Sequence, residues 1–338
     1  MHFNINSAIS HNPSTNSCFT DYTFHTGLGV SKMKLSRRRF LQAMAAASTA
    51  LVNRHGHTAS ISTRHTRIIP SSNEQIPAVG MGSWLVFAID PDNEGELATR
   101  EVVIREFLMH GGGMIDSSPM YGVAQDVIGR CLKRIDDHTG LFSATKVWTH
   151  GNRQGLLQME DSRLLWGLPR FDLMQVHNLM DWETHLPNLY DMKDEGGVRY
   201  VGVTTSHGRR HEEMIDILHS QPLDFVQLTY NLMDREAEEH LLPLAADKGI
   251  AVIINRPFQG GGLFDKFSRY RLPKWATDID CENWAQFFLK FVISHPAVSC
   301  AIPATSRVDH LQQNMGAAYG RLPEPAMRKK MVQYVQNL

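Results

Sequence analysis

The sequence predicts an α/β fold, a single (β/α)8 barrel of the TIM-barrel kind. From Ile68 onward, short apolar segments alternate with longer amphipathic segments, as strands and helices do in a βα repeat. Several of the short segments, such as residues 251–254 and, apart from Gln227, residues 225–228, are apolar on successive residues, which is typical of parallel strands covered on both faces. Eight repeats over about 250 residues favour a closed barrel over an open, doubly wound sheet.

The elements follow one another without a linker. The expected strands are residues 79–84, 113–116, 141–146, 173–177, 200–204, 225–228, 251–255 and 300–303. The expected helices are residues 94–109, 125–134, 154–166, 183–195, 210–219, 235–248, 284–294 and 307–318. Before the first strand, residues 67–77 place a polar turn between two apolar ends, which predicts a β-hairpin capping the bottom of the barrel. Because no Pro/Ser-rich tract divides the chain after Ile68, residues 67–338 are predicted to form one domain.

Residues 1–66 are interpreted as a leader and signal region, disordered or removed in the mature protein. Three arginines at residues 37–39 precede Phe40, Leu41 and an alanine-rich segment, and this pattern resembles a twin-arginine export signal. We therefore expect the twin-arginine export machinery to carry the protein to the periplasm, or a cytoplasmic location if the signal does not function. Met33 is the expected true start, with cleavage between residues 48 and 66. The alternative is a basic patch before an ordinary helix.

Composition favours small-molecule chemistry. The chain has 338 residues, of which 42% are hydrophobic and 20% charged, so a large core is available. A formal net charge of -1 argues against a nucleic-acid partner, and no apolar segment reaches the ~18 residues of a membrane span. Beyond the leader, Cys131, Cys281 and Cys300 lack metal-ligand spacing, and we expect buried thiols.

Four polar residues occupy strand ends or the loop beside them. Asp116 ends the second strand, Tyr121 lies on the next loop, Lys146 ends the third strand and His177 ends the fourth. The carboxyl ends of barrel strands meet at one face, where active sites of this fold lie. A titratable group on an otherwise buried strand costs free energy unless it is paired or functional. We therefore expect these four side chains to converge.

The four residue types fit proton donation to a carbonyl oxygen. A neighbouring ammonium, Lys146, is expected to lower the pKa of the Tyr121 phenol, so that Tyr121 acts as general acid. Asp116 would hold Lys146 charged and oriented, and a neutral His177 would polarise the carbonyl. Taken singly, each residue also has a structural interpretation as a loop anchor, a core histidine or half of an ion pair.

The motifs around these residues resemble those of the aldo/keto reductases. The similar segments are residues 115–122, 144–146, 172–177, 197–203, 226–231 and 302–305, in order, within a resemblance that runs from about residue 68 to residue 314. The resemblance implies a (β/α)8 fold, no metal, and hydride transfer between NAD(P)H and an aldehyde or ketone. It favours NADP(H), with NAD(H) as the alternative.

The resemblance also implies a cofactor site, with several departures from the family pattern. Thr204 and Thr205 stand where a Ser-Asn pair is usual, and Asn255 replaces a stacking tyrosine. Ala304 and His310 stand where a lysine and an arginine often hold the 2′-phosphate; Arg307 could take over that role. The full expected set is Thr204, Thr205, Gln227, Asn255, Arg256, Pro257, Phe258, Gly261, Ala304, Thr305, Arg307, His310, Gln313 and Asn314.

Three residues beside the expected catalytic groups, Trp84, Met120 and Trp148, are predicted to line a substrate pocket, although aromatic residues at strand ends also cap barrels. A short C-terminal segment predicts an open, permissive pocket for a small carbonyl compound. Two other functions were weighed. An exported nucleotide-binding barrel with a regulatory role and little turnover is the alternative, and a metallohydrolase is disfavoured because no His-x-His motif or carboxylate cluster ends a strand.

Overall fold

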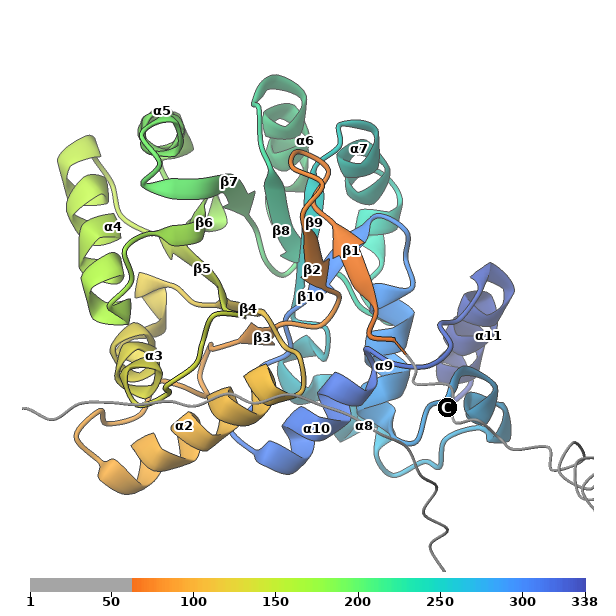
Figure 1. Ribbon diagram of the computed structural model, residues 1–338. Helices are drawn as coiled ribbons and strands as arrows, with labels where there is room; N and C mark the ends of the chain where they lie inside the picture. The colour runs from red at the N-terminus through yellow and green to blue at the C-terminus, as the bar shows by residue number, and fades with distance from the viewer. Residues whose placement is uncertain (1–62) are drawn as a thin grey trace, which may run out of the picture. The chain divides into compact units, whose positions relative to one another are not determined.

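An eight-stranded parallel sheet forms the centre of the protein, as seen in a computed structural model that describes residues 63–338. The strands lie in chain order, each hydrogen-bonded to the one before. Bridges between Val79 and Ala301 and between Gly82 and Ala304 join the first strand to the last, which closes the barrel (Figure 1). The strands are β3 (Met81–Gly82), β4 (Met114–Asp116), β5 (Phe142–Val147), β6 (Phe171–Val176), β7 (Val198–Thr204), β8 (Phe225–Thr229), β9 (Ala251–Asn255) and β10 (Val298–Ala301). The predicted (β/α)8 barrel is confirmed.

Helices follow the strands and surround the sheet (Figure 1). They are α2 (Glu94–Met109), α3 (Ala124–Lys133), α4 (Asn152–Trp166), α5 (Trp182–Asp194), α6 (His211–Ser220), α7 (Leu241–Asp247), α8 (Gly262–Phe267), α9 (Trp284–Ile293), α10 (Val308–Gly316) and α11 (Pro325–Gln336). Five 3-10 turns accompany them: η1 (Pro119–Tyr121), η2 (His177–Leu179), η3 (Glu236–Glu238), η4 (Gln259–Gly261) and η5 (Lys274–Ile279).

Local chemistry explains where the predicted helices begin. Asn93 caps α2 by accepting a hydrogen bond from the Glu96 backbone N–H at 3.2 Å, and this helix has the predicted bounds. The helix predicted over residues 235–248 is instead divided into η3 and α7. Pro243 lacks an N–H and fits only the first turn of an α-helix, so α7 begins at Leu241.

Two helices were not predicted. The short helix α8 lies between the strand predicted over residues 251–255 and the helix predicted over residues 284–294, and α11 occupies the C-terminal segment. Met331, Val332 and Val335 form the buried face of α11, and the Arg328 guanidinium lies 4.2 Å from the ring centre of Phe291 in α9. This contact helps to explain why all ten residues of α9 are buried.

An N-terminal hairpin plugs the barrel, as predicted. Strands β1 (Thr66–Ile68) and β2 (Gln75–Pro77) pair antiparallel around a turn in which Asn73 has a φ of 61°. Ile69 and Ile76 pack with inward-facing strand residues that include Phe225. The Tyr200 hydroxyl donates a hydrogen bond to Glu74 at 2.6 Å. The hairpin therefore fills one end of the barrel, and the other end remains for a site.

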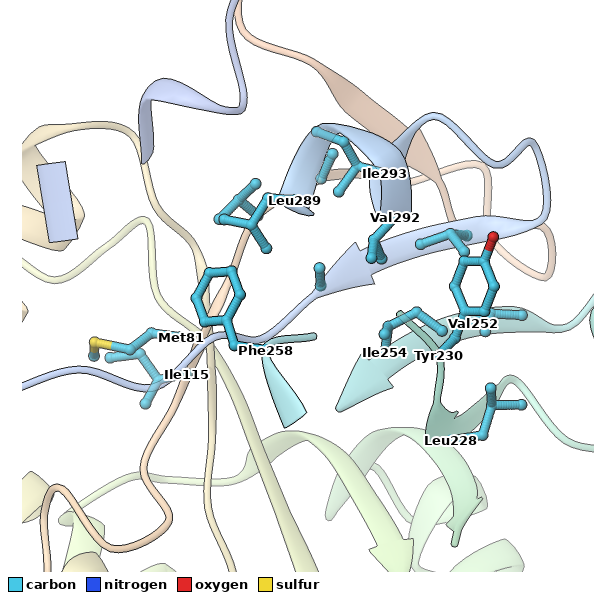
Figure 2. Packing of buried hydrophobic residues seen from close by; sticks show 14 of the residues in the cluster. Met81, Ile115, Leu228, Tyr230, Val252, Ile254, Phe258, Leu289, Val292 and Ile293 are labelled. Carbon is cyan, nitrogen blue, oxygen red and sulfur yellow. The ribbon is translucent and has the colours of Figure 1, made fainter. Parts of the chain in front are cut away.

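A larger apolar cluster lies between the sheet and its helices. Figure 2 shows Leu289 and Val292 of α9 with Val252 and Ile254 of β9 within this cluster. Side chains of the strands thus alternate between an inner core and this outer core, which explains why both faces of the strands are apolar. The predicted buried thiols Cys131, Cys281 and Cys300 are confirmed as free and buried.

The predicted leader and twin-arginine signal lie in residues 1–62, outside the part of the chain that the structure describes. Within residues 63–338, no helix is both long enough and apolar enough to cross a membrane.

Candidate active site

A buried ion pair stands at the carboxyl ends of β4 and β5. The Lys146 ammonium donates a hydrogen bond to the Asp116 carboxylate at 2.5 Å and a second one to the Ser117 carbonyl at 2.7 Å. Both side chains are almost fully buried. Burial lowers the pKa of Lys146, and the charge of Asp116 opposes that change. The predicted pairing of these two residues is present in the structure.

The turn η1 carries Tyr121 over this pair. The Ser118 hydroxyl caps the turn by accepting a hydrogen bond from the Met120 N–H at 3.1 Å, and Gly122, with a φ of 61°, ends it. The Lys146 ammonium then lies 5.2 Å from the centre of the Tyr121 ring. Three of the four predicted catalytic residues are therefore neighbours.

His177 follows β6 directly and completes the group. Its ring meets the Tyr121 ring edge to face, with 5.6 Å between the ring centres. Its Nδ1 lies 2.7 Å from the Ser118 hydroxyl. Burial, assisted by repulsion from Lys146, lowers the pKa of His177 to about 2, so the imidazole is neutral at physiological pH, as the sequence interpretation required.

The expectation that Lys146 lowers the pKa of the Tyr121 phenol is wrong. Burial raises the pKa of Tyr121 above its ordinary value of 10.0, and the negative charge of Asp116 raises it further. The expectation of a lowered pKa considered the ammonium alone. In the structure that ammonium is neutralised by its carboxylate partner, so Tyr121 remains a phenol and its proton is available for donation.

Two buried amides complete the surroundings of Asp116. Gln175 and Gln227 each donate a hydrogen bond from Nε2 to Asp116 Oδ1, at 3.1 Å and 2.9 Å. Gln227 was expected to contact the cofactor, whereas Gln175, at an inward position one residue before Val176 on β6, was not predicted from the sequence. A polar residue at an inward position of an otherwise apolar strand was the signal that could have found it.

A cavity of about 350 Å³ opens above these residues. The residues predicted for the site that line it are Trp84, Asp116, Met120, Tyr121, His177, Thr204, Thr205, Gln227, Asn255, Arg256, Pro257, Phe258, Gly261, Ala304 and His310. Lining residues that the sequence analysis did not name include Ser83, Leu85, Val86, Asn178, Ser206, His207, Phe264 and Ile302. Lys146 lies behind Tyr121 rather than in the wall.

Several predicted residues do not line this cavity. Trp148 is exposed on the loop after β5, where its backbone bonds to the Gln158 side chain, so the structure does not place it in the pocket. Arg307 already forms a two-point ion pair with Asp309. The remaining predicted residues outside the lining are Thr305, Gln313 and Asn314.

Asn255, at the position where the family resemblance implies a tyrosine, is held by hydrogen bonds to its neighbours. It accepts a hydrogen bond from the Thr229 hydroxyl at 2.6 Å and donates one to the Thr205 carbonyl at 2.8 Å. The Thr205 side chain, which is 2% exposed, has no hydrogen-bond partner for its hydroxyl within the described chain. A buried hydroxyl without a partner at a cavity wall is free to bond to a ligand.

Among residues 63–338, no group of three or more His, Cys, Asp or Glu side chains is arranged to hold a metal ion. The polar groups that line the cavity include a phenol, three imidazoles, hydroxyls, amides, the Asp116 carboxylate and one guanidinium.

The fold and this site define a (β/α)8 barrel with its polar groups at the carboxyl ends of the strands. Residues 78–329 match the sequence profile of the aldo/keto reductase family. The chain belongs to this family.

Relatives agree with this membership. The aldo-keto reductase YhdN of Bacillus subtilis is 28% identical over 191 residues, which are 52% of this chain and little more than half, 56%, of that protein. The NADH-specific methylglyoxal reductase of Escherichia coli is 25% identical over 233 residues, 59% of this chain and 68% of that protein. An aldo/keto reductase of Klebsiella pneumoniae, solved in complex with NADP and acetate, has the same fold, with a TM-score of 0.68 and 21% identity over 81% of this chain and 96% of that one.

Proposed function

We propose that the protein is an NAD(P)H-dependent carbonyl reductase that interconverts an aldehyde or ketone and the corresponding alcohol. One observation carries the proposal: a protonated phenol and a neutral imidazole share the floor of one cavity, above a buried Lys-Asp pair. The family to which the chain belongs supports the same reaction class.

Each residue then has a distinct task. The Tyr121 hydroxyl donates its proton to the carbonyl oxygen, and the resulting phenolate is stabilised by the Lys146 ammonium. His177 donates a hydrogen bond to the same oxygen through Nε2–H, the tautomer in which Nδ1 accepts from the Ser118 hydroxyl. Asp116, held by Lys146 and two glutamine amides, acts behind the reacting atoms as a positioning residue. Reprotonation of the phenolate completes the cycle.

The cofactor supplies the hydride to the carbonyl carbon when it is bound. The residues present fit such a group. The unpartnered Thr205 hydroxyl can bond to an amide or a sugar hydroxyl, and Gly260 and Gly261 have φ values of 67° and 105° that permit close backbone approach. NADP(H) is the proposed cofactor, supported by the Klebsiella structure in complex with NADP. NAD(H) remains the second candidate, because the Escherichia coli relative is NADH-specific.

The purified protein is expected to oxidise NADPH in the presence of aldehydes, and to do so with a lower KM than for NADH. Steady-state absorbance at the reduced nicotinamide band, with a panel of aldehydes and both cofactors, measures this. Binding of NADPH without any oxidation would support the regulatory alternative, and no binding of either cofactor would contradict both functions.

We further propose export by the twin-arginine route, because residues 37–39 and the following alanine-rich segment resemble its signal. Expression of the full chain should give a shortened protein in the periplasmic fraction. A charge-conserving control, with Arg37, Arg38 and Arg39 all replaced by Lys, should remain at full length in the cytoplasm. The unchanged chain at full length in the cytoplasm would contradict export.

A further inference from the structure

Among the described residues that line the cavity with Tyr121 and His177, Arg256 is the only lysine or arginine. It follows the last residue of β9 and has a φ of 48°, a left-handed conformation that is uncommon outside glycine. Its carbonyl accepts a hydrogen bond from the Asn231 amide at 3.2 Å, which fixes the backbone. A single cation is thus placed in the wall of the cavity that holds Tyr121 and His177.

The guanidinium of Arg256 has no acceptor within the described part of the chain. It makes no hydrogen bond or ion pair with any residue from 63 to 338, whereas Arg307 and Arg210 each grip a carboxylate. Asp234 is close enough for its charge to act on Arg256, but burial has the larger effect and lowers the pKa of the guanidinium. A half-buried cation without a partner is poorly compensated, and an anionic ligand group would compensate it.

The Trp84 ring and Gly260 lie beside the guanidinium. Its carbon lies 5.9 Å from the ring centre of Trp84, on the loop after β3, at cation–π distance. A Cβ at Gly260 would lie 3.5 Å from both terminal nitrogens, so the absence of a side chain there leaves room next to them. A planar fork held in this way suits the two oxygens of a carboxylate.

The rest of the lining sets the nature of the ligand. The apolar members of the wall include Leu85, Val86, Met120, Phe258 and Phe264. A ligand that matches this wall has an apolar body and one anionic end. Trp84 and Met120 are also predicted to line the substrate pocket, so Arg256, in the same wall, lies next to a residue that is expected to contact the substrate.

We propose that Arg256 recognises a carboxylate on the carbonyl substrate, so that the enzyme selects aldehydes or ketones that carry one negative charge. The inference rests on the proposed reductase function. The diphosphate of the dinucleotide is the other source of anionic oxygens at this site, and the experiment separates the two.

The test compares 4-carboxybenzaldehyde with methyl 4-formylbenzoate, which share a ring and an aldehyde but differ in charge. The wild-type kcat/KM for the acid should exceed that for the ester by about tenfold or more, the factor of one charge-assisted hydrogen bond. In Arg256→Met the ratio should fall to near one, and in Arg256→Lys it should lie between these values. Arg269→Met is the matched control, since Arg269 also stacks on an aromatic ring, at 4.9 Å, but lies outside the cavity lining; it should keep the wild-type ratio.

Two outcomes would overturn the proposal, and a binding measurement decides if the protein reduces neither aldehyde. An unchanged ratio in Arg256→Met, with a raised Kd for NADPH, would assign Arg256 to the diphosphate. If the wild type reduces neither aldehyde, calorimetric titration with 4-(hydroxymethyl)benzoate and its methyl ester decides. Tighter binding of the acid that is lost in Arg256→Met supports carboxylate recognition although the reductase function has failed, and equal binding of acid and ester overturns the recognition itself.

Discussion

Replacement of Tyr121 by Phe is expected to lower kcat/KM for aldehyde reduction by about a thousandfold, within the range for loss of a general acid. The variant removes one hydroxyl from the cavity floor and leaves the ring that packs on His177. NADPH affinity should stay close to the wild-type value, because the phenol acts on the carbonyl oxygen. Steady-state NADPH oxidation gives the rate, and fluorescence quenching gives the affinity.

Tyr319→Phe is the matched control, since the Tyr319 hydroxyl donates a hydrogen bond to the His110 carbonyl at 3.2 Å, away from the cavity lining; this variant should retain wild-type kinetics. Equal rates for the wild type and Tyr121→Phe would remove Tyr121 from the acid role.

The pH dependence of kcat/KM gives a second test of this role. Tyr121 must be protonated to donate a proton to the carbonyl oxygen, so the reductase activity is present below the pKa of Tyr121 and is lost above it. Because that pKa is raised above 10.0, and His177 is neutral above about pH 2, neither group should produce an inflection between pH 6 and pH 9.

The barrel could be predicted from the sequence because its information is local. Each strand is a short apolar run, and each helix has its own period and start signals, as at Asn93 before α2. Polar residues at the ends of such runs then had to meet at one face, and Asp116, Lys146 and His177 do. Pro243 shows the limit of this reasoning, because it shortened a helix whose periodicity extended further.

The electrostatics of the site could not be predicted in the same way. The pKa of Tyr121 depends on the sum of burial, an ammonium and its carboxylate partner, and the sequence shows only which groups exist. Arg307 seemed free for a phosphate, but its pairing with Asp309 depends on side-chain conformation. The role of Gln175 arises from a contact between strands 59 residues apart in the chain. Such pairings depend on the inward register of β4 and β6, which local patterns do not specify.

The Asp116–Lys146 pair allows its structural role to be separated from its catalytic role. Lys146→Met leaves the buried Asp116 carboxylate without its cation and should lower the free energy of unfolding by about 3–5 kcal/mol. In Asp116→Asn/Lys146→Met neither buried position of the pair carries a charge, and the Asn oxygen can still accept from Gln175 and Gln227. The double variant should therefore recover most of the lost stability, as measured by urea denaturation at pH 7.

Activity should not recover with stability. Without an ammonium beside it, the phenolate formed when Tyr121 donates its proton is no longer stabilised, so kcat/KM should remain at least about a hundredfold below the wild type in both variants. The exposed Arg307, which pairs with Asp309 on the surface, provides a control, since Arg307→Met should leave the urea midpoint unchanged. Full activity in the refolded double variant would mean that the pair only supports the fold. Full stability in Lys146→Met would mean that Asp116 does not depend on the ammonium for its burial. Low activity in a stable double variant would show that the pair has a catalytic role that is separate from its contribution to stability.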